Sequence, residues 1–314
     1  LRQRFKAWGR EMPDINKRQA YVIEGADILP NPHGSAVGML AEIGGKLLII
    51  LPGPPRENQP MFNEHVLPRL KAIAGETHVR RRLLRVSGLG ESAVDEIAAP
   101  IYTSYPSVQT SILFNKSEVE LHVAARADSA AEAQTTADEV ADKLISALGK
   151  AVFSTNGETM EEIVGALLTA RGETVSIAES CTGGLIGQRV TSVPGSSAYF
   201  MEGAVTYSND AKMRTLNVPV EIIEQHGAVS AECAEAMAAG MREYAGTDHA
   251  ISITGIAGPD GGTEEKPVGT VYIGYSGRNI TKSVHLVLPG DRYLIRWRSS
   301  QAALDYLRRQ LFGK

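Results

Sequence analysis

Apolar and polar positions follow three successive patterns, which divide the chain into three predicted units. In the first, residues 46–51 form a mostly apolar run short enough for a buried strand, and a Pro-Gly-Pro-Pro loop and a helix through Met61 and Leu70 follow it. A loop beyond a strand can bind a ligand in an open α/β sheet. Because the strands that should precede it are missing, we interpret this loop as a stiff connector. Residues 1–74 then read as the end of an α/β unit.

The second pattern, in residues 75–153, predicts a small α+β domain. Residues 108–114 and 119–124 alternate between apolar and polar side chains, as half-buried strands do. Residues 130–148 place Ala, Val and Leu side chains on one face of a long helix. Both features are typical of a small α+β domain.

A basic strand and a short glycine motif open this second unit. Residues 79–86 carry four arginines, a pattern that could bind RNA but is more often the solvated face of a strand. The sequence Gly88-Leu89-Gly90 is by itself a weak signal of a phosphate-binding loop. Neither feature leads us to expect a nucleic-acid partner.

The third pattern, in residues 154–314, alternates strands and helices and predicts an α/β domain. The predicted strands are residues 175–178, 200–207 and 250–254, with an antiparallel hairpin of residues 269–275 and 280–288. The predicted helices are residues 159–171, 220–225, 231–244 and 292–311, and a further helical pattern begins at Gly183.

The composition excludes several classes of protein. At 314 residues, 43% hydrophobic and 22% charged, the chain resembles an ordinary globular protein, and no apolar run approaches the roughly 20 residues of a membrane span. The net charge of −4 gives no reason to expect a nucleic-acid or membrane partner. Two cysteines are too few for a disulfide framework or a cysteine zinc site, so we expect a cytoplasmic protein. No signal peptide is visible, and the start at Leu1 inside a patterned region suggests that the natural beginning is missing.

Polar segments follow three predicted strands of the third unit. They are residues 179–184, which include Ser180 and Thr182, residues 207–212, and the glycine-rich residues 254–262. Loops at one edge of an α/β sheet converge into one pocket. A hydroxyl on such a turn is a nucleophile, an anion ligand beside free backbone N–H groups, or simply a helix cap.

The chemistry of these segments favours a lysine as the base for Ser180. Serine is a weak nucleophile until a base removes its proton. Three histidines lie outside the polar segments: His226, His249 and His285. Lys212 lies within one, and a lysine in a partly desolvated pocket can accept a proton. Serine–lysine pairs are a known arrangement for amide hydrolysis.

Other side chains have secondary roles in this hypothesis. Tyr207 could relay a proton or donate a hydrogen bond. Cys181 is a rival nucleophile, but no polar segment gives it a histidine partner. Arg292 and Arg296 share a helix face, where they either bind a phosphate through paired N–H groups or form ion pairs with surface acids. The glycine-rich segment does not fit an ATP-type phosphate loop, although its backbone can approach an anion closely.

Several long motifs in order carry a resemblance to a known family. AESCTGGLIGQRVTSVPGSSAYFMEGAVTYSNDAKMRTLNV, GAVS, ITGIAGPDGG, KPVGTVYIG and GDRYLIR closely resemble the carboxy-terminal domain of the CinA family (competence/damage-inducible protein A). Upstream, QAYVIEGADILPNPHGSAVGM and LPGPPRENQPMF resemble the last part of the family's molybdopterin-binding-like domain, and residues 80–153 resemble its small middle domain. The resemblance implies three domains. Residues 1–74 are a truncated molybdopterin-binding-like α/β unit, residues 75–153 are the α+β middle domain, and residues 154–314 are an α/β amidase domain.

The resemblance also implies an activity and a site. Family members act as nicotinamide-nucleotide amidohydrolases, with Ser180 as the implied nucleophile, Lys212 as the base and Tyr207 beside them. The residues expected to line the substrate pocket are Thr182, Gly183, Gly184, Thr254, Gly255, Gly258 and Arg296. Backbone N–H groups of residues 182–184 are expected to stabilise the oxyanion, and the glycine-rich loop or Arg296 to hold the 5′-phosphate. No metal or other cofactor is expected for this activity.

The predicted reaction converts nicotinamide mononucleotide to nicotinate mononucleotide and ammonia, in a protein that we expect to be a homodimer. One alternative is a nucleotide-binding protein, associated with competence or recombination, whose pocket is inactive. A second is an ADP-ribose pyrophosphatase that acts through residues 1–74 and needs a divalent metal. The family's amino-terminal domain carries a Gly-Asp-Glu-Leu-type motif and a Gly-Gly-Leu-Gly-Pro-Thr-x-Asp-Asp-type loop; the absence of both from this sequence weighs against that second alternative.

Overall fold

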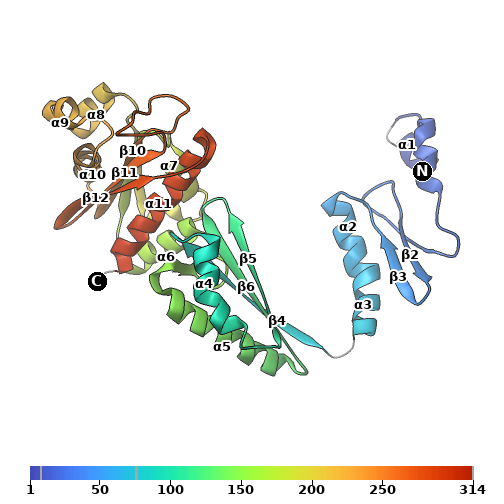
Figure 1. The fold of residues 1–314 in the computed structure, drawn as a ribbon. Coiled ribbons are helices and arrows are strands. Elements are labelled where there is room, and N and C mark those ends of the chain that lie inside the picture. The colour runs from blue at the N-terminus through green and yellow to red at the C-terminus, as the bar shows by residue number, and fades with distance from the viewer. Residues whose placement is uncertain (8, 75–76, 313–314) are drawn as a thin grey trace. The chain divides into compact units, whose positions relative to one another are not determined.

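The computed structural model describes residues 1–7, 9–74 and 77–312, and these form two compact units, Leu1–Thr77 and His78–Lys314 (Figure 1). The predicted boundary between residues 74 and 75 adjoins residues 75–76, which lie outside the described residues. No helix in the described part of the chain combines the length and apolar character needed to cross a membrane.

The first unit is a small antiparallel sheet with a helix packed on it. Its strands β1 (Asp27–Leu29), β2 (Gly38–Ile43) and β3 (Lys46–Ile50) pair in that order. The helical segments α2 (Pro55–Met61), η2 (Phe62–Val66, a π-helical turn) and α3 (Leu67–Ala74) follow one another directly, and α1 (Arg2–Ala7) and η1 (Asp14–Ala20) precede the sheet. The predicted helix through Met61 and Leu70 is thus confirmed.

The prediction of a buried strand at residues 46–51 is wrong. β3 is the edge strand of an antiparallel sheet, and its side chains alternate between exposed and half-buried. Leu47 and Ile49 pack against the core of this unit, which includes Met61 and Val66. An antiparallel sheet can bury one face and leave the other in solvent, so an apolar run alone did not reveal how much of the strand is covered.

The second unit begins with a four-stranded antiparallel sheet. Its elements are β4 (His78–Ser87), α4 (Glu91–Tyr102), β5 (Val108–Asn115), β6 (Glu118–Ala127), α5 (Ala130–Leu148), η3 (Gly149–Ala151) and β7 (Val152–Ser154). The strand order β5-β6-β4-β7 together with the β-α-β-β-α-β chain order gives a ferredoxin-like arrangement. Both helices cover one face of the sheet, where they bury Leu84, Val86 and Leu121. The predicted α+β character of this segment is confirmed.

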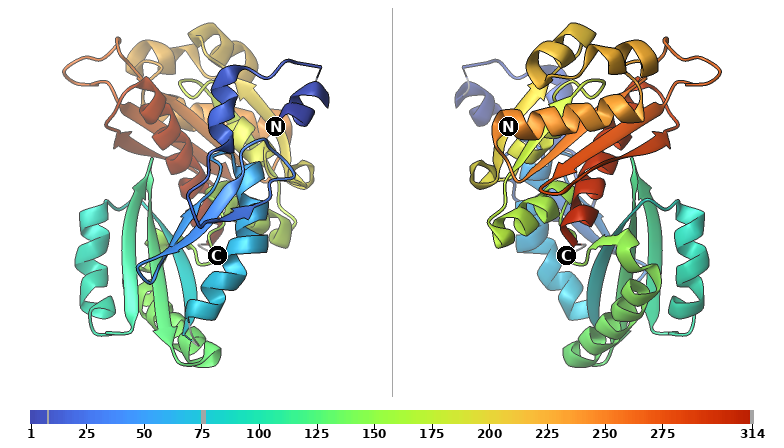
Figure 2. Two further views of the ribbon diagram at one scale, coloured as in Figure 1. Left: turned by 90° about the vertical axis from the view of Figure 1, so that its right-hand side faces the viewer. Right: turned by 90° about the vertical axis from the view of Figure 1, so that its left-hand side faces the viewer.

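The rest of the second unit is a five-stranded mixed sheet between two layers of helices. Its elements are α6 (Met160–Arg171), β8 (Val175–Glu179), α7 (Leu185–Thr191), η4 (Ser196–Ala198), β9 (Phe200–Val205), α8 (Asn209–Leu216), α9 (Val220–His226), α10 (Ala231–Ala245), β10 (His249–Gly255), β11 (Thr270–Gly277), β12 (Ile280–Val287) and α11 (Arg292–Phe312). The strand order is β12-β11-β10-β8-β9. Figure 2 shows α10 (gold) and α11 (red) on opposite faces of this sheet, each over its own apolar core.

The direction of the strands brings the three polar segments together. β8 pairs in parallel with β10 on one side and with β9 on the other, so all three strands end at the same edge. The predicted polar segments, residues 179–184, 207–212 and 254–262, lie at these three strand ends. This confirms the prediction that they share one edge of the sheet, which is where open α/β sheets bind ligands.

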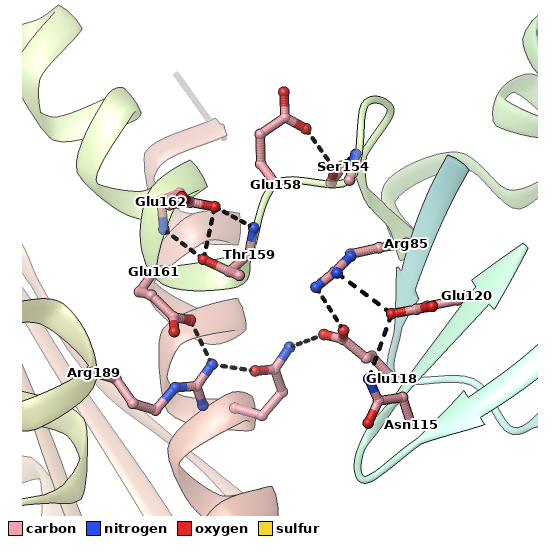
Figure 3. A network of polar contacts seen from close by, with 12 residues as sticks. Arg85, Asn115, Glu118, Glu120, Ser154, Glu158, Thr159, Glu161, Glu162 and Arg189 are labelled. Carbon is pink, nitrogen blue, oxygen red and sulfur yellow. Dashed lines mark hydrogen bonds and ion pairs between the residues drawn. The ribbon is translucent and has the colours of Figure 1, made fainter. Parts of the chain in front are cut away.

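A buried polar network joins the ferredoxin-like sheet to the helices of the larger sheet (Figure 3). Arg189 of α7 donates to Glu161 (2.7 Å) and to Gln301 (2.6 Å), and Gln301 in turn donates to Glu118 of β6 (3.1 Å). Arg85 of β4 pairs with Glu118 at 3.0 Å. Burial raises the pKa of Glu118, although the neighbouring Arg85 opposes the shift. The network therefore fixes α7 against the neighbouring sheet.

We expect Gly240→Ala in α10 to destabilise the protein. In a helix, replacing Gly with Ala normally stabilises by up to about 1 kcal/mol. A Cβ at Gly240 would lie 1.8 Å from the carbonyl oxygen of Leu216 at the end of α8, so the two helices would have to separate. The expected cost is about 1–3 kcal/mol, measured by urea unfolding. A stabilised variant would show that α8 and α10 are not in this close contact.

Candidate active site

Ser180 lies on a tight turn between β8 and α7. Its backbone N–H donates to the carbonyl of Ile253 in β10 (3.0 Å), and its own carbonyl accepts from the N–H of Gly183 (3.1 Å). Gly183 and Gly184 have φ of 59° and 92°, a left-handed conformation that side chains disfavour. The helix therefore begins at Leu185 and not, as predicted, at Gly183. The two glycines turn the chain so that Ser180 stays at the edge of the sheet.

Glu179 caps the helix that follows this turn, a role that the sequence analysis missed. Its carboxylate is 2% exposed and accepts from the backbone N–H groups of Gly184 (3.0 Å), Ile186 (3.2 Å) and Gly187 (2.8 Å). A carboxylate at this position satisfies N–H groups that a helix leaves unpaired and also interacts favourably with the helix dipole. Glu179 thus fixes the turn that carries Ser180.

Lys212 is buried beside Ser180. Its side chain is 1% exposed, and Nζ donates to Ser180 Oγ (3.1 Å) and to the carbonyls of Thr206 (2.9 Å) and Tyr207 (3.3 Å). These three acceptors match the three N–H donors of an ammonium group. Lys212 lies on α8, a helix that the sequence analysis did not predict. Ser208, whose hydroxyl accepts from the N–H of Ala211, was the available signal for its start.

The surroundings of Lys212 favour its neutral form. Burial lowers the pKa of Lys212 from its ordinary value of 10.5, and the thiols of Cys233 and Cys181 oppose this shift. The acceptors around Nζ are a hydroxyl and two carbonyls, so none of its hydrogen-bond partners is a carboxylate. A neutral amine in this place can accept the proton of Ser180, with which it is already in contact. The geometry brings the predicted nucleophile and base together.

Tyr207 is hydrogen-bonded to Lys212 through its backbone, while its phenol is bonded to Arg292. The side chain is 59% exposed, and its hydroxyl accepts from Arg292 at 3.1 Å. Only the backbone carbonyl of Tyr207 contacts Lys212. The contact of Tyr207 with Lys212 thus comes from the main chain, and the role of its phenol as a proton relay or hydrogen-bond donor stays a prediction.

Arg292 and Arg296 of α11 hold the backbone of two polar segments. Arg296 donates to the carbonyl of Thr182 (2.5 Å), and Arg292 donates to the carbonyl of Gly258 (2.8 Å). Neither contact involves a surface acid, which was one of the two alternatives. A guanidinium has five N–H donors, so both side chains keep donors for a further ligand. In the third segment the Thr254 hydroxyl donates to the carbonyl of Ala228 (2.7 Å), so it supports the loop before α10.

The expected oxyanion donors are partly used within the protein. The N–H of Gly183 donates to Ser180, and that of Gly184 donates to Glu179. Within residues 77–312, the backbone N–H groups of Cys181 and Thr182 donate to no other residue, and the fully buried hydroxyl of Thr182 has no partner. Of the predicted donors, the N–H of Thr182 therefore stays available to an oxyanion, and that of Cys181, which was not predicted, is available beside it.

The rival groups are poorly suited to the same chemistry. Burial raises the pKa of Cys181 to about 12, so its thiol stays protonated near neutral pH. His249 bonds Tyr275 and Glu173 at the start of β10, whereas Ser180 follows the end of the parallel strand β8. The preference for Lys212 over histidine agrees with this placement.

Two family models match adjacent parts of the second unit. The model of the CinA C-terminal domain matches residues 157–311, and the model of the damage-inducible protein CinA KH domain matches residues 81–154. A CinA-like protein from Solibacter usitatus is 46% identical over 314 residues, which are all of this chain and 76% of that protein. The chain belongs to the CinA family. It is also 48% identical to a CinA-like protein from Koribacter versatilis, over 99% of this chain and 76% of that protein.

Two solved structures of CinA-family proteins resemble about half of this chain. One is the competence/damage-inducible protein CihA from Agrobacterium tumefaciens, with 40% identity, a TM-score of 0.46, and coverage of 47% of this chain and 91% of that one. Another is a CinA superfamily protein from Klebsiella pneumoniae, with 32% identity, a TM-score of 0.47, and coverage of 49% of this chain and 98% of that one.

We expect Glu179→Ala to destabilise the protein strongly, because it leaves three N–H groups of the turn without their acceptor. Each buried donor left unsatisfied costs about 1–3 kcal/mol. Glu179→Gln keeps one carbonyl acceptor and should lose less. The measurement is the free energy of unfolding in urea, with Glu202→Ala, at an exposed position of β9, as the control. Equal stabilities of Glu179→Ala and Glu202→Ala would contradict the capping role.

Proposed function

We propose that this chain is a nicotinamide-nucleotide amidohydrolase that converts nicotinamide mononucleotide to nicotinate mononucleotide and ammonia. The observation that carries the proposal is the contact of 3.1 Å between the buried Nζ of Lys212 and Ser180 Oγ, at the edge where three strands end. The motifs around both residues resemble the amidohydrolase domain of the CinA family, which supports the same reaction.

In the proposed first step, Ser180 Oγ attacks the carboxamide carbon while neutral Lys212 takes the hydroxyl proton. The backbone N–H groups of Cys181 and Thr182 stabilise the oxyanion; one such donor typically contributes about 3–4 kcal/mol. The carbon–nitrogen bond then breaks, and Lys212 returns the proton to the departing ammonia. A water molecule next loses a proton to Lys212 and attacks the acyl group. Ser180 leaves with that proton and is restored.

The 5′-phosphate is proposed to bind on the α11 side of the pocket. Arg292 and Arg296 reach two of the polar segments and keep spare N–H donors. The glycine-rich segment between Thr254 and Gly262 supplies backbone close to Arg292. Binding of a group remote from the carboxamide contributes to catalysis by orienting the reacting carbon.

Ser180→Ala is expected to lower ammonia release from nicotinamide mononucleotide by about 10³-fold or more, since among the described residues only Ser180 places a hydroxyl in hydrogen-bond contact with Lys212. The assay is release of ammonia, run with and without a chelator. Ser197→Ala, at an exposed position of the short helix η4 before β9, is the matched control and should keep the parental rate. If Ser180→Ala retains activity within about tenfold of the parent, Ser180 is not the nucleophile.

The rate should rise with pH along a limb set by Lys212. Because burial lowers the pKa of Lys212, the neutral base forms at a pH below 10.5. Activity should therefore increase as the pH rises toward the lowered pKa of Lys212. Lys212→Arg keeps the charge and N–H donors but cannot accept a proton. Both Lys212→Arg and Lys212→Met should therefore be inactive although folded by circular dichroism.

An active Lys212→Arg variant would assign Lys212 an electrostatic role and remove it as the base. Binding of nicotinamide mononucleotide by the parent protein without ammonia release would support the alternative of a nucleotide-binding protein with an inactive pocket. Metal-dependent activity on ADP-ribose would support the pyrophosphatase alternative for residues 1–74.

A further inference from the structure

A second cavity lies between the ferredoxin-like sheet and α11, away from Ser180. Its volume is about 710 Å³, within the range of small-molecule sites. One wall is the Ser87–Gly90 turn with Phe114; the other is formed by β12, the loop after it, and α11. We propose that this cavity binds a monophosphate ester that carries a flat apolar ring, as a nucleoside monophosphate does. The proposal does not depend on the amidohydrolase activity.

The polar end of the cavity has the features of an anion site. Gly90 precedes α4 without any side chain capping the first-turn N–H groups of that helix, and Gly88 adopts a φ of 82° in the turn before it. A Cβ at Gly88 would lie 3.4 Å from a terminal guanidinium nitrogen of Arg309, so the guanidinium faces this turn. Among the residues that the structure describes, Arg309 donates only to Asp305, through Nε, which leaves its terminal nitrogens for a phosphate.

An unpartnered hydroxyl provides a second, independent observation. Ser87 is 4% exposed, and no described residue accepts or donates a hydrogen bond at its side chain. Val86 faces the core beneath α4 and α5, so the next residue along the strand faces the opposite side, where Ser87 lines the cavity. The Ser87 hydroxyl is therefore open to the cavity, where a phosphate oxygen can accept its hydrogen bond in place of solvent.

The rest of the cavity suits a ring. Leu286, Leu288 and Ala302 give it an apolar wall, and Phe114 is 47% exposed on the other side. The guanidinium of Arg298 lies 5.9 Å from the centre of the Phe114 ring. Charged side chains at the cavity are Arg298, Arg309 and Asp305, which leave a net positive charge. A flat ring can stack on Phe114 while its phosphate reaches Arg309.

The test is isothermal titration of the full chain with AMP, with adenosine and inorganic phosphate as separate probes. AMP should bind with a stoichiometry of one and more tightly than either part. Arg309→Met and Ser87→Ala should each weaken AMP binding by about tenfold. Because no described residue is hydrogen-bonded to the Ser87 hydroxyl, Ser87→Ala should leave the thermal midpoint unchanged, which separates lost binding from lost folding. Arg278→Met, at the exposed turn between β11 and β12, is the control and should bind as the parent does.

Three outcomes would overturn the proposal. The first is no heat of binding with millimolar AMP. The second is AMP binding that Arg296→Met weakens and Arg309→Met does not, which would place the nucleotide beside Ser180. The third is equal affinity for AMP and inorganic phosphate, which would remove the ring from the assignment.

Discussion

The site depends on the burial of one ammonium group. Lys212 has almost no contact with solvent, and its hydrogen bonds go to two main-chain carbonyls and to Ser180. Taking a charge out of water is costly unless a countercharge accompanies it, and no carboxylate is among these partners. The cost lowers the pKa of Lys212 and makes its neutral form accessible. The surrounding structure holds the lysine in this unfavourable place.

Two strand ends and the helix α11 provide that support. Glu179 fixes the turn after β8, Thr206 and Tyr207 direct their carbonyls at Lys212 after β9, and α11 holds the turn through the contact of Arg296 with Thr182. The helix α7 follows Ser180 in the chain, and the buried network that reaches the ferredoxin-like sheet holds it in place (Figure 3). The geometry at Ser180 is thus linked to both halves of the second unit.

Much of this arrangement follows from local sequence pattern. The helix at residues 130–148 and the hairpin of β11 and β12 were predicted because their periodicity persists over many residues. Ser180 and Lys212 were found because each lies in a polar segment after a predicted strand. The capping by Glu179 and the contacts of Arg292 and Arg296 were missed, since their partners are set by how the chain folds. The burial of β3 was overestimated because a run of apolar residues does not tell whether one or both faces of a strand are covered.

The central claim is that Lys212 has a lowered pKa in the folded protein. The most direct measurement is an NMR titration of the lysine side-chain signals, with the Lys212 resonance assigned by its loss in Lys212→Met. A pKa clearly below 10.5 is the predicted result. A value at or above 10.5 would contradict the account, because the amine would then be charged at every pH where the protein works.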